Sequence, residues 1–245
     1  MTVQRGFTLI EMAIVLVIIT ILIGGLAMPL SAQIQARRIA ETKQTLQEAR
    51  EALFGYAMTH PAAAVPTNRY LPCPDSNGDG REDRVSDTQC TAYQGLLPWV
   101  DLGTAPQDAW GNRLRYAIVM QFIDRSNGFS ASTPTPPGPP TFGFDPLRIC
   151  STHTCPGPNV AADVVFVLVS HGPNGWGAQN MNNAPGSLQA APTGLDEADN
   201  LDANPTYISR SPTKSDAASG EFDDLTVWAS QSQLIARVCP TGCPP

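Results

Sequence analysis

An apolar run near the N-terminus constrains this chain more than any other feature. The run covers residues 7–30 and holds a single charged residue, Glu11. A helix of this length, rising about 1.5 Å per residue, matches the ~30 Å hydrocarbon layer of a membrane. The small residue Gly6 precedes the run, whereas the cleavage site of an ordinary secretory signal follows a shorter apolar region. A cut after Gly6 would therefore remove only residues 1–6 and leave the apolar helix attached.

The segment around this junction reads Gly6-Phe7-Thr8-Leu9-Ile10-Glu11-Met12. Together with the apolar run it resembles the N-terminus of the type IV pilin and pseudopilin superfamily, over the chain to about Gly55. The resemblance implies that a prepilin peptidase cuts after Gly6 and methylates the new N-terminal Phe7. It also implies three parts: a leader at 1–6, a transmembrane and filament-core helix at 7–30, and a pilin-like globular ectodomain at 31–245, with 31–59 continuing the helix.

Glu11 is the unusual residue of the run. An acidic side chain at the centre of a membrane helix costs roughly 2.5–3.5 kcal/mol, so a partner is expected. After cleavage Glu11 lies four residues from the amine of Phe7, on the same helix face and near the positive end of the helix dipole. We predict that Glu11 pairs with this amine, in its own chain or a neighbour's, and sets the register of assembly. The alternative is a carboxylate near the headgroups with no assembly role.

The composition of the chain limits what residues 31–245 can form and bind. The formal net charge of −7 argues against nucleic acid as a partner, because phosphate binding favours a basic surface. Residues 31–245 are enough for one domain with a hydrophobic core. With 23 Pro and 20 Gly, this part should be rich in loops.

Six cysteines in an exported chain indicate disulfides, although many pairings are possible. Proximity in the sequence favours Cys73–Cys90, Cys150–Cys155 and Cys239–Cys243. The alternative is a zinc site, since His153 lies between Cys150 and Cys155. The chain has no Cys-x-x-Cys pair, and an oxidising compartment disfavours thiolate ligands.

Hydrophobic spacing predicts the main elements of the ectodomain. A helix to about Thr59 should bury one face through residues at three- and four-residue steps: Ile39, Leu46, Ala49, Leu53 and Tyr56. Strands are expected at 113–120, at 163–170 in a central position, and at 225–229, followed by a short helix or edge strand at 233–238. Residues 178–220 read as a long polar insertion that should not form a core.

Residues 75–80 read Asp-Ser-Asn-Gly-Asp-Gly and fit the start of a calcium loop. Calcium takes six to eight oxygen ligands, which alternating acidic side chains supply around a glycine turn. The candidate ligands are Asp75, Asn77, Asp79 and Asp83, while the position normally held by a bidentate Glu is Ser86. The alternative is a turn without an ion, because Asp, Asn and Gly dominate turns.

The ectodomain carries a second resemblance, in three short segments. The segments 108–112 (Asp-Ala-Trp-Gly-Asn), 170–175 (Ser-His-Gly-Pro-Asn-Gly) and 223–228 (Asp-Asp-Leu-Thr-Val-Trp) are similar, in order, to segments of the major pseudopilins of type II secretion. This implies an α+β, type IV pilin-like fold: a long N-terminal helix packed on a small antiparallel β-sheet, with long disulfide-stapled loops.

The same resemblance implies a calcium site between the last two segments. The matching residues are Asn174 and Asp223, with Asp224 adjacent. Two departures weaken the match: Asn174 is neutral where the family has Asp, and the connecting loop is far longer here.

These features predict a structural subunit, a minor pilin or pseudopilin of a type IV pilus or type II secretion filament. The alternative is a tip-located pilin that binds a surface, a secreted substrate or DNA. Expected partners are other subunits, the prepilin peptidase, the inner-membrane assembly platform and the membrane itself. The expected location is the bacterial inner membrane, single-pass, with a cytoplasmic N-terminus and a periplasmic or extracellular C-terminal domain, and then the filament. No nucleophile, metal-hydrolase or phosphate-loop motif is present, which argues against an enzyme.

Overall fold

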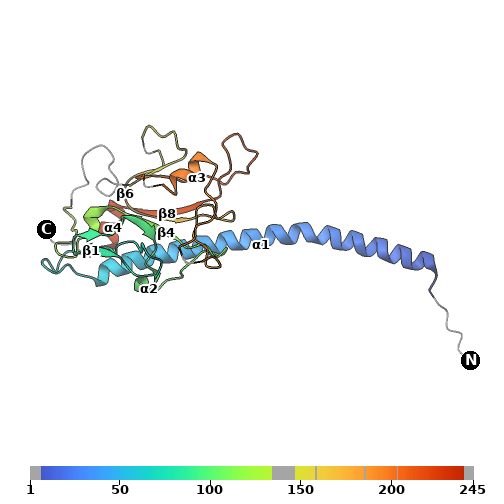
Figure 1. Cartoon of the computed structure of the whole chain (residues 1–245), viewed down its shortest axis with the longest axis horizontal. Helices are drawn as coiled ribbons and strands as arrows, with labels where there is room; N and C mark the ends of the chain where they lie inside the picture. The colour runs from blue at the N-terminus through green and yellow to red at the C-terminus, as the bar shows by residue number, and fades with distance from the viewer. Residues whose placement is uncertain (1–6, 134–146, 158, 185, 203, 240–245) are drawn as a thin grey trace, which may run out of the picture. The chain divides into compact units, whose positions relative to one another are not determined.

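The computed structural model describes residues 7–133, 147–157, 159–184, 186–202 and 204–239, with only the backbone at 23–29 (Figure 1). The chain divides into two compact units, Met1–Ala40 and Glu41–Pro245. The leader, including Gly6, and the residue Cys243 lie outside the described part.

The first unit is dominated by helix α1, which spans Leu9–Thr59 and therefore continues into the second unit. Its large apolar side chains are exposed: Phe7 is 84% exposed, Leu9 89% and Ile21 67%. Within the described residues, no helix meets the length and apolarity needed to cross a membrane.

In the second unit, α1 buries the face that the spacing predicts. Leu46, Ala49 and Leu53 are fully buried, Tyr56 is buried, and Ile39, in the first unit, is half-buried. The helix ends at Thr59, ahead of Pro61, which cannot supply a backbone N–H to continue it.

The strands are short and mostly antiparallel. Six of the described strands form one sheet in the order β3-β4-β6-β5-β7, with β8 also paired to β6, and β1 and β2 form a separate hairpin. The β5–β7 pair is parallel. The strands are β1 Arg84–Ser86, β2 Gln89–Cys90, β3 Gln94–Leu96, β4 Arg115–Ile118, β5 Leu147–Cys150, β6 Ala161–Ser170, β7 Thr206–Ile208 and β8 Leu225–Ser230. The remaining helices are α2 Trp99–Leu102, the 3-10 turn η1 Met120–Phe122, α3 Leu195–Asp199 and α4 Gln231–Val238.

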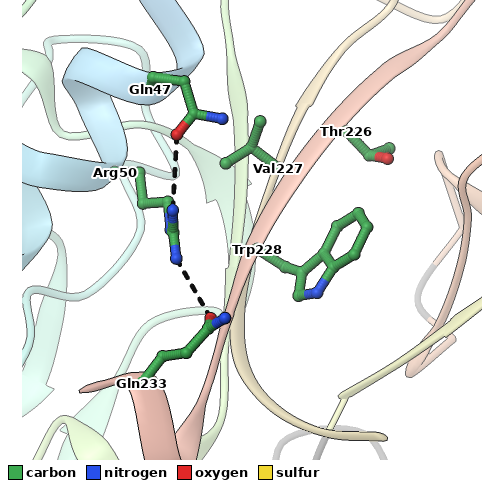
Figure 2. A pocket seen from close by; sticks show the side chains of 6 residues that line it. All are labelled: Gln47, Arg50, Thr226, Val227, Trp228 and Gln233. Atoms are coloured by element: carbon green, nitrogen blue, oxygen red, sulfur yellow. Dashed lines mark hydrogen bonds between the residues drawn. The ribbon is translucent and has the colours of Figure 1, made fainter. Parts of the chain in front are cut away.

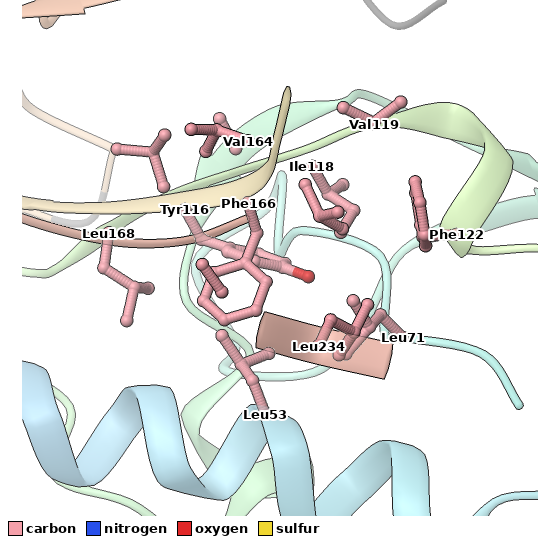
Figure 3. Close-up of a cluster of buried hydrophobic side chains, with 14 of the residues drawn as sticks. Leu53, Leu71, Tyr116, Ile118, Val119, Phe122, Val164, Phe166, Leu168 and Leu234 are labelled. Atoms are coloured by element: carbon pink, nitrogen blue, oxygen red, sulfur yellow. The ribbon is translucent and has the colours of Figure 1, made fainter. Parts of the chain in front are cut away.

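Strand β6 forms the centre of the sheet, as its continuous apolar run predicts. Residues 164–170 are all buried, and β6 pairs with β4, β5 and β8. Its Phe166 meets Phe54 of α1 edge-on, with ring centroids 5.8 Å apart. Figure 3 shows this core between α1, the sheet and α4, with Leu53, Phe166 and Leu234 converging.

Residues 231–238 resolve the predicted ambiguity in favour of a helix, α4. Ser230 caps it: its side chain accepts from the Gln233 N–H, and the Gln233 side chain accepts from the Ser230 N–H. Arg50 of α1 donates to Gln233 Oε1 at 3.1 Å, so α1 and α4 are joined beside a groove that Trp228 also lines (Figure 2).

The prediction that residues 178–220 form no core is wrong. This insertion contains α3 and β7, and its Tyr207 and Ile208 are buried against β5 and Phe222. The insertion is polar in composition, yet a few apolar residues are enough to add a parallel strand to the sheet. Its polar residues Asp196, Glu197 and Asn200 are buried as well.

Candidate functional site

The N-terminus of α1 is closed by a reciprocal side-chain cap. The Thr8 N–H and hydroxyl donate to Glu11 Oε2 at 2.7 and 2.8 Å, and the Glu11 N–H donates to the Thr8 hydroxyl at 3.3 Å. This is a capping box, in which Thr8 is the N-cap and Glu11 the third helical residue. Glu11 is therefore a structural residue of the helix start in addition to its predicted role toward the Phe7 amine.

The second candidate site is an acidic cluster in the ectodomain. Glu197, Asp223 and Asp224 each place one carboxylate oxygen within 4.8 Å of the other two. Glu197 comes from α3, and the two aspartates stand directly before β8. The turn at 172–175, which follows β6, lies against them. Two distant parts of the sequence thus bring three negative groups together, and a third part, the turn after β6, lies beside them.

The turn after β6 approaches Asp223 closely because it contains Gly172. This glycine has a φ of +56°, and a Cβ added to it would clash with the Asp223 backbone oxygen and lie 2.6 Å from Asp223 Oδ1. A side chain at this position would therefore displace the backbone of Asp223 as well as its carboxylate. From the same turn, the Asn174 N–H donates to Asp223 Oδ2 at 3.2 Å.

Asn174 lies where the sequence predicts it, beside Asp223. Its side-chain nitrogen faces Glu197 Oε1 at 3.3 Å, while its Oδ1 accepts from the Trp176 N–H. The Asp223 N–H also donates to Glu197 Oε1, at 3.0 Å. In this arrangement Asn174 contributes hydrogen-bond donors to the cluster, and its role as a metal ligand stays a prediction.

Burial and mutual repulsion raise the proton affinity of the cluster. Desolvation raises the pKa of Asp223 to about 7, and the nearby charges of Glu197 and Asp224 act in the same direction. Desolvation, followed by the charge of Asp224, also raises the pKa of Glu197 above its ordinary value. Such coupled carboxylates favour either a proton or a cation between them.

Asp224 is held by two buried partners. Its Oδ1 lies 3.3 Å from His171 Nδ1, and its Oδ2 accepts from Asn200 Nδ2 at 2.8 Å. Asn200 in turn joins the backbone of Ile208 through both ends of its amide. Asp224 is therefore fixed to the insertion and to the end of β6.

The donor set fits a hard divalent cation. All three cluster groups offer carboxylate oxygen, which calcium and magnesium prefer, and calcium tolerates irregular geometry. Asp223 Oδ1 is buried and has no hydrogen-bond partner among the described residues. An ion bound by these carboxylates would satisfy that oxygen and neutralise the repulsion.

The first predicted calcium loop is organised differently. Asp75 is buried and accepts the backbone N–H groups of Asn77, Gly78 and Gly80. Asp83 Oδ2 accepts from Ser76, while Asn77 and Asp79 cap N–H groups two residues onward. These oxygens close the turn on itself, as the alternative interpretation expects, and calcium binding there stays a prediction.

The disulfide prediction is confirmed for two pairs. Cys73–Cys90 and Cys150–Cys155 are bonded, so the zinc alternative at Cys150 and Cys155 is excluded by the chemistry of its ligands. Cys239 is the last described residue, and its predicted partner lies beyond.

Sequence reasoning missed Glu197, the third carboxylate of the cluster. The signal available was the acidic run Asp196-Glu197-Ala198-Asp199 within the polar insertion. Nothing in the sequence linked that run to Asp223, because α3 reaches the site only when the insertion folds.

Comparison with known proteins finds a known motif in the N-terminal segment. Residues 1–27 match the family model of the prokaryotic N-terminal methylation motif. This stretch contains Gly6, Phe7 and Glu11. No curated protein and no solved structure matches the chain.

Proposed function

We propose that this chain, which carries the prepilin cleavage signal of type IV pilins and pseudopilins, is a minor pilin or pseudopilin of a type IV pilus or a type II secretion filament. In this proposal a prepilin peptidase cuts after Gly6 and methylates Phe7. The processed subunits then polymerise through the first part of α1. The motif and the pilin-like α+β fold point to a structural subunit and not to an enzyme.

The observation that carries the proposal is the exposure of the apolar N-terminal helix. Side chains from Leu9 to Leu22 include ten large aliphatic residues that are each at least 44% exposed: Leu9, Ile10, Ile14, Val15, Leu16, Val17, Ile18, Ile19, Ile21 and Leu22. Contiguous apolar surface of this kind marks a surface that lipid or another protein covers. Helices of neighbouring copies would bury it in a filament.

We include membrane anchoring in the proposal. Before assembly, residues 7–30 would hold the chain in the bacterial inner membrane, with the N-terminus in the cytoplasm and the ectodomain outside. The methylation motif and the apolar composition of this stretch support this topology. The matching measurement is protease digestion of spheroplasts, in which the ectodomain should be degraded and the peptide that contains residues 7–30 should be protected.

We also propose that Glu197, Asp223 and Asp224 hold calcium. The ion would fasten the insertion to the turn after β6 and to the start of β8, because these segments supply the cluster and its neighbours. Its part would be structural, keeping the ectodomain surface rigid for packing in the filament.

The assembly role of Glu11 can be separated from its capping role. Gln at this position retains a capping box, since Glu and Gln both serve there, but it removes the negative charge. We expect Glu11→Gln to insert normally and to abolish incorporation into filaments. Thr8→Ala removes the cap and keeps the charge, so it should still be incorporated.

The readout is the amount of chain in sheared or purified filaments relative to the amount in membranes. Normal incorporation of Glu11→Gln would contradict the pairing of Glu11 with the Phe7 amine. Incorporation lost in Thr8→Ala but normal in Glu11→Gln would indicate that only the capped helix start matters.

A further inference from the structure

A buried ion pair between Asp196 and Arg210 is connected, through neighbouring residues, to two carboxylates of the acidic cluster. These are the carboxylates of Glu197 and Asp223. Asp196 Oδ2 accepts from Arg210 Nε at 2.6 Å, and the two side chains are only 5% and 11% exposed. Asp196 directly precedes Glu197 in α3. The ion pair therefore anchors the helix turn that carries Glu197.

Arg210 reaches the other side of the cluster. Its guanidinium lies 4.5 Å from the centre of the Phe222 ring, and Phe222 directly precedes Asp223. Arg210 also donates to Thr213 Oγ1 at 2.7 Å, and Thr213 pairs with Phe222 through two backbone hydrogen bonds. The Asp196–Arg210 pair thus fixes the neighbours of Glu197 and Asp223 at once.

A disulfide loop completes this arrangement. The His153 N–H donates to Asp196 Oδ1 at 2.8 Å, and His153 Nδ1 lies 3.2 Å from the same oxygen. His153 sits inside the loop that the Cys150–Cys155 disulfide closes. Cys150 and Cys155 also pack against Phe222 and Ile208. The closed loop therefore holds Asp196 on one side and Phe222 on the other.

We propose that Asp196 and Arg210 are positioning residues for the calcium site, and that the Cys150–Cys155 disulfide is coupled to the site through them. This inference rests on the calcium part of the proposed function. Oxidised Cys150–Cys155 keeps the His153 N–H at Asp196, and Asp196 and Arg210 keep Glu197 and Asp223 at the spacing that one ion can bridge. Residues that orient metal ligands from behind typically change metal affinity by roughly 10–100-fold.

Coupling of this kind is reciprocal. If the closed disulfide raises calcium affinity by some factor, bound calcium lowers the equilibrium constant for reducing that disulfide by the same factor. Reduction adds two electrons and two protons and leaves two thiols. A dithiol reductant supplies them and becomes a cyclic disulfide.

The wild-type chain contains its own control. The Cys73–Cys90 disulfide encloses the other predicted calcium loop, which contains Asp75 and Asp83. The full chain in detergent is equilibrated in mixtures of reduced and oxidised dithiothreitol, with saturating calcium or with chelator, and alkylated. Mass spectrometry of the peptides then gives the reduced fraction of each pair. We expect calcium to make Cys150–Cys155 about tenfold harder to reduce and to leave Cys73–Cys90 unchanged.

Variants test the positioning residue directly. Asp196→Asn keeps an oxygen for the His153 N–H but weakens the pairing with Arg210, and we expect calcium affinity from calorimetry to fall about tenfold. Cys150→Ser with Cys155→Ser should give a similar loss. Glu51→Gln, which removes one negative charge from the exposed Glu51–Arg237 pair, is the matched control and should bind calcium as the wild type does.

The outcomes separate this inference from the function on which it rests. Calcium heat without protection of Cys150–Cys155 overturns the coupling and leaves the calcium site standing. Protection of Cys73–Cys90 instead places calcium in the Asp75 loop and also overturns it. Absence of calcium heat overturns the calcium site and the coupling together, while the filament proposal stands or falls on Glu11→Gln.

Discussion

Glu197 supplies the negative charge that the turn after β6 lacks at Asn174. Its carboxylate accepts from the Asp223 N–H and faces the Asn174 amide, so it is tied to both segments that the calcium hypothesis joins. A single side chain of this insertion, Glu197, therefore decides whether the cluster has two or three carboxylates.

We expect Glu197→Gln to weaken calcium binding at least about tenfold, a loss that supporting residues alone produce. The amide keeps the size and hydrogen-bonding capacity of the side chain, while the charge is lost. Calcium at about a hundred times its Kd should stabilise the wild type by about 2.7 kcal/mol and the variant by clearly less at the same concentration. Thermal melts with calcium and with chelator provide the measurement. Asp216→Asn, an exposed carboxylate in the same insertion, should behave as the wild type.

The pH dependence of stability in chelator should carry the signature of Asp223. Its pKa rises from an ordinary 3.8 to about 7 in the folded chain, mainly through desolvation. Between these values the folded state binds more protons than the unfolded state, so the free energy of unfolding falls as the pH rises through this window. Asp223→Asn should lessen that fall. A melting-temperature profile as steep as that of the wild type would contradict this origin, and calcium should offset the fall because it binds the ionised form.

At the scale of elements, the second half of α1 is the support on which the sheet rests. Leu53 is fully buried and lies in the core with Phe166 of β6 and Leu234 of α4 (Figure 3). The helix, the central strand and the last helix therefore share one hydrophobic contact region.

Leu53→Ala should lower the free energy of unfolding by about 2–5 kcal/mol, since it removes buried methyl groups and leaves a cavity. Met58→Ala on the same helix, at a residue 42% exposed, should change it by about 0.5 kcal/mol or less. Denaturant titration of both variants tests the difference. Equal losses would show that α1 is not packed on the sheet through this face.

Elements with a repeating pattern were predictable from the sequence, and the site was predictable only in part. The spacing of Leu46, Ala49 and Leu53 gave the buried face of α1, and the apolar run of β6 gave the central strand. The turn at Asn174 and the start of β8 were identified by resemblance. The parallel β5–β7 pair and the role of Glu197 could not be predicted from the sequence. Tyr207, Ile208 and Glu197 contact residues that lie far away in the chain, and no local pattern indicates such contacts.

At the scale of the whole molecule, the proposed function depends on removal of the leader. In this proposal, cleavage after Gly6 would create an amine at Phe7, four residues from Glu11, and would leave the hydrogen bonds between Thr8 and Glu11 intact. The capped helix start is therefore compatible with both the uncut and the cut chain.

We expect chain isolated from its native membrane or filament to begin at N-methylated Phe7. Gly6→Val should block the cut, because the peptidase meets a bulky residue where the motif has glycine. Mass spectrometry of the N-terminal peptide and gel mobility report both. Native material that still begins with Met1 and lacks the methyl group would overturn the assignment as a pilin-type subunit.

The close approach of Gly172 to Asp223 has a consequence for how this protein can evolve. A Cβ at position 172 would meet the Asp223 backbone oxygen before it met the carboxylate, and the positive φ would strain any side chain there whatever residue stands at position 223. Loss of the acidic cluster would therefore not release this glycine. A set of related sequences would show glycine retained at this position even where position 223 is no longer acidic.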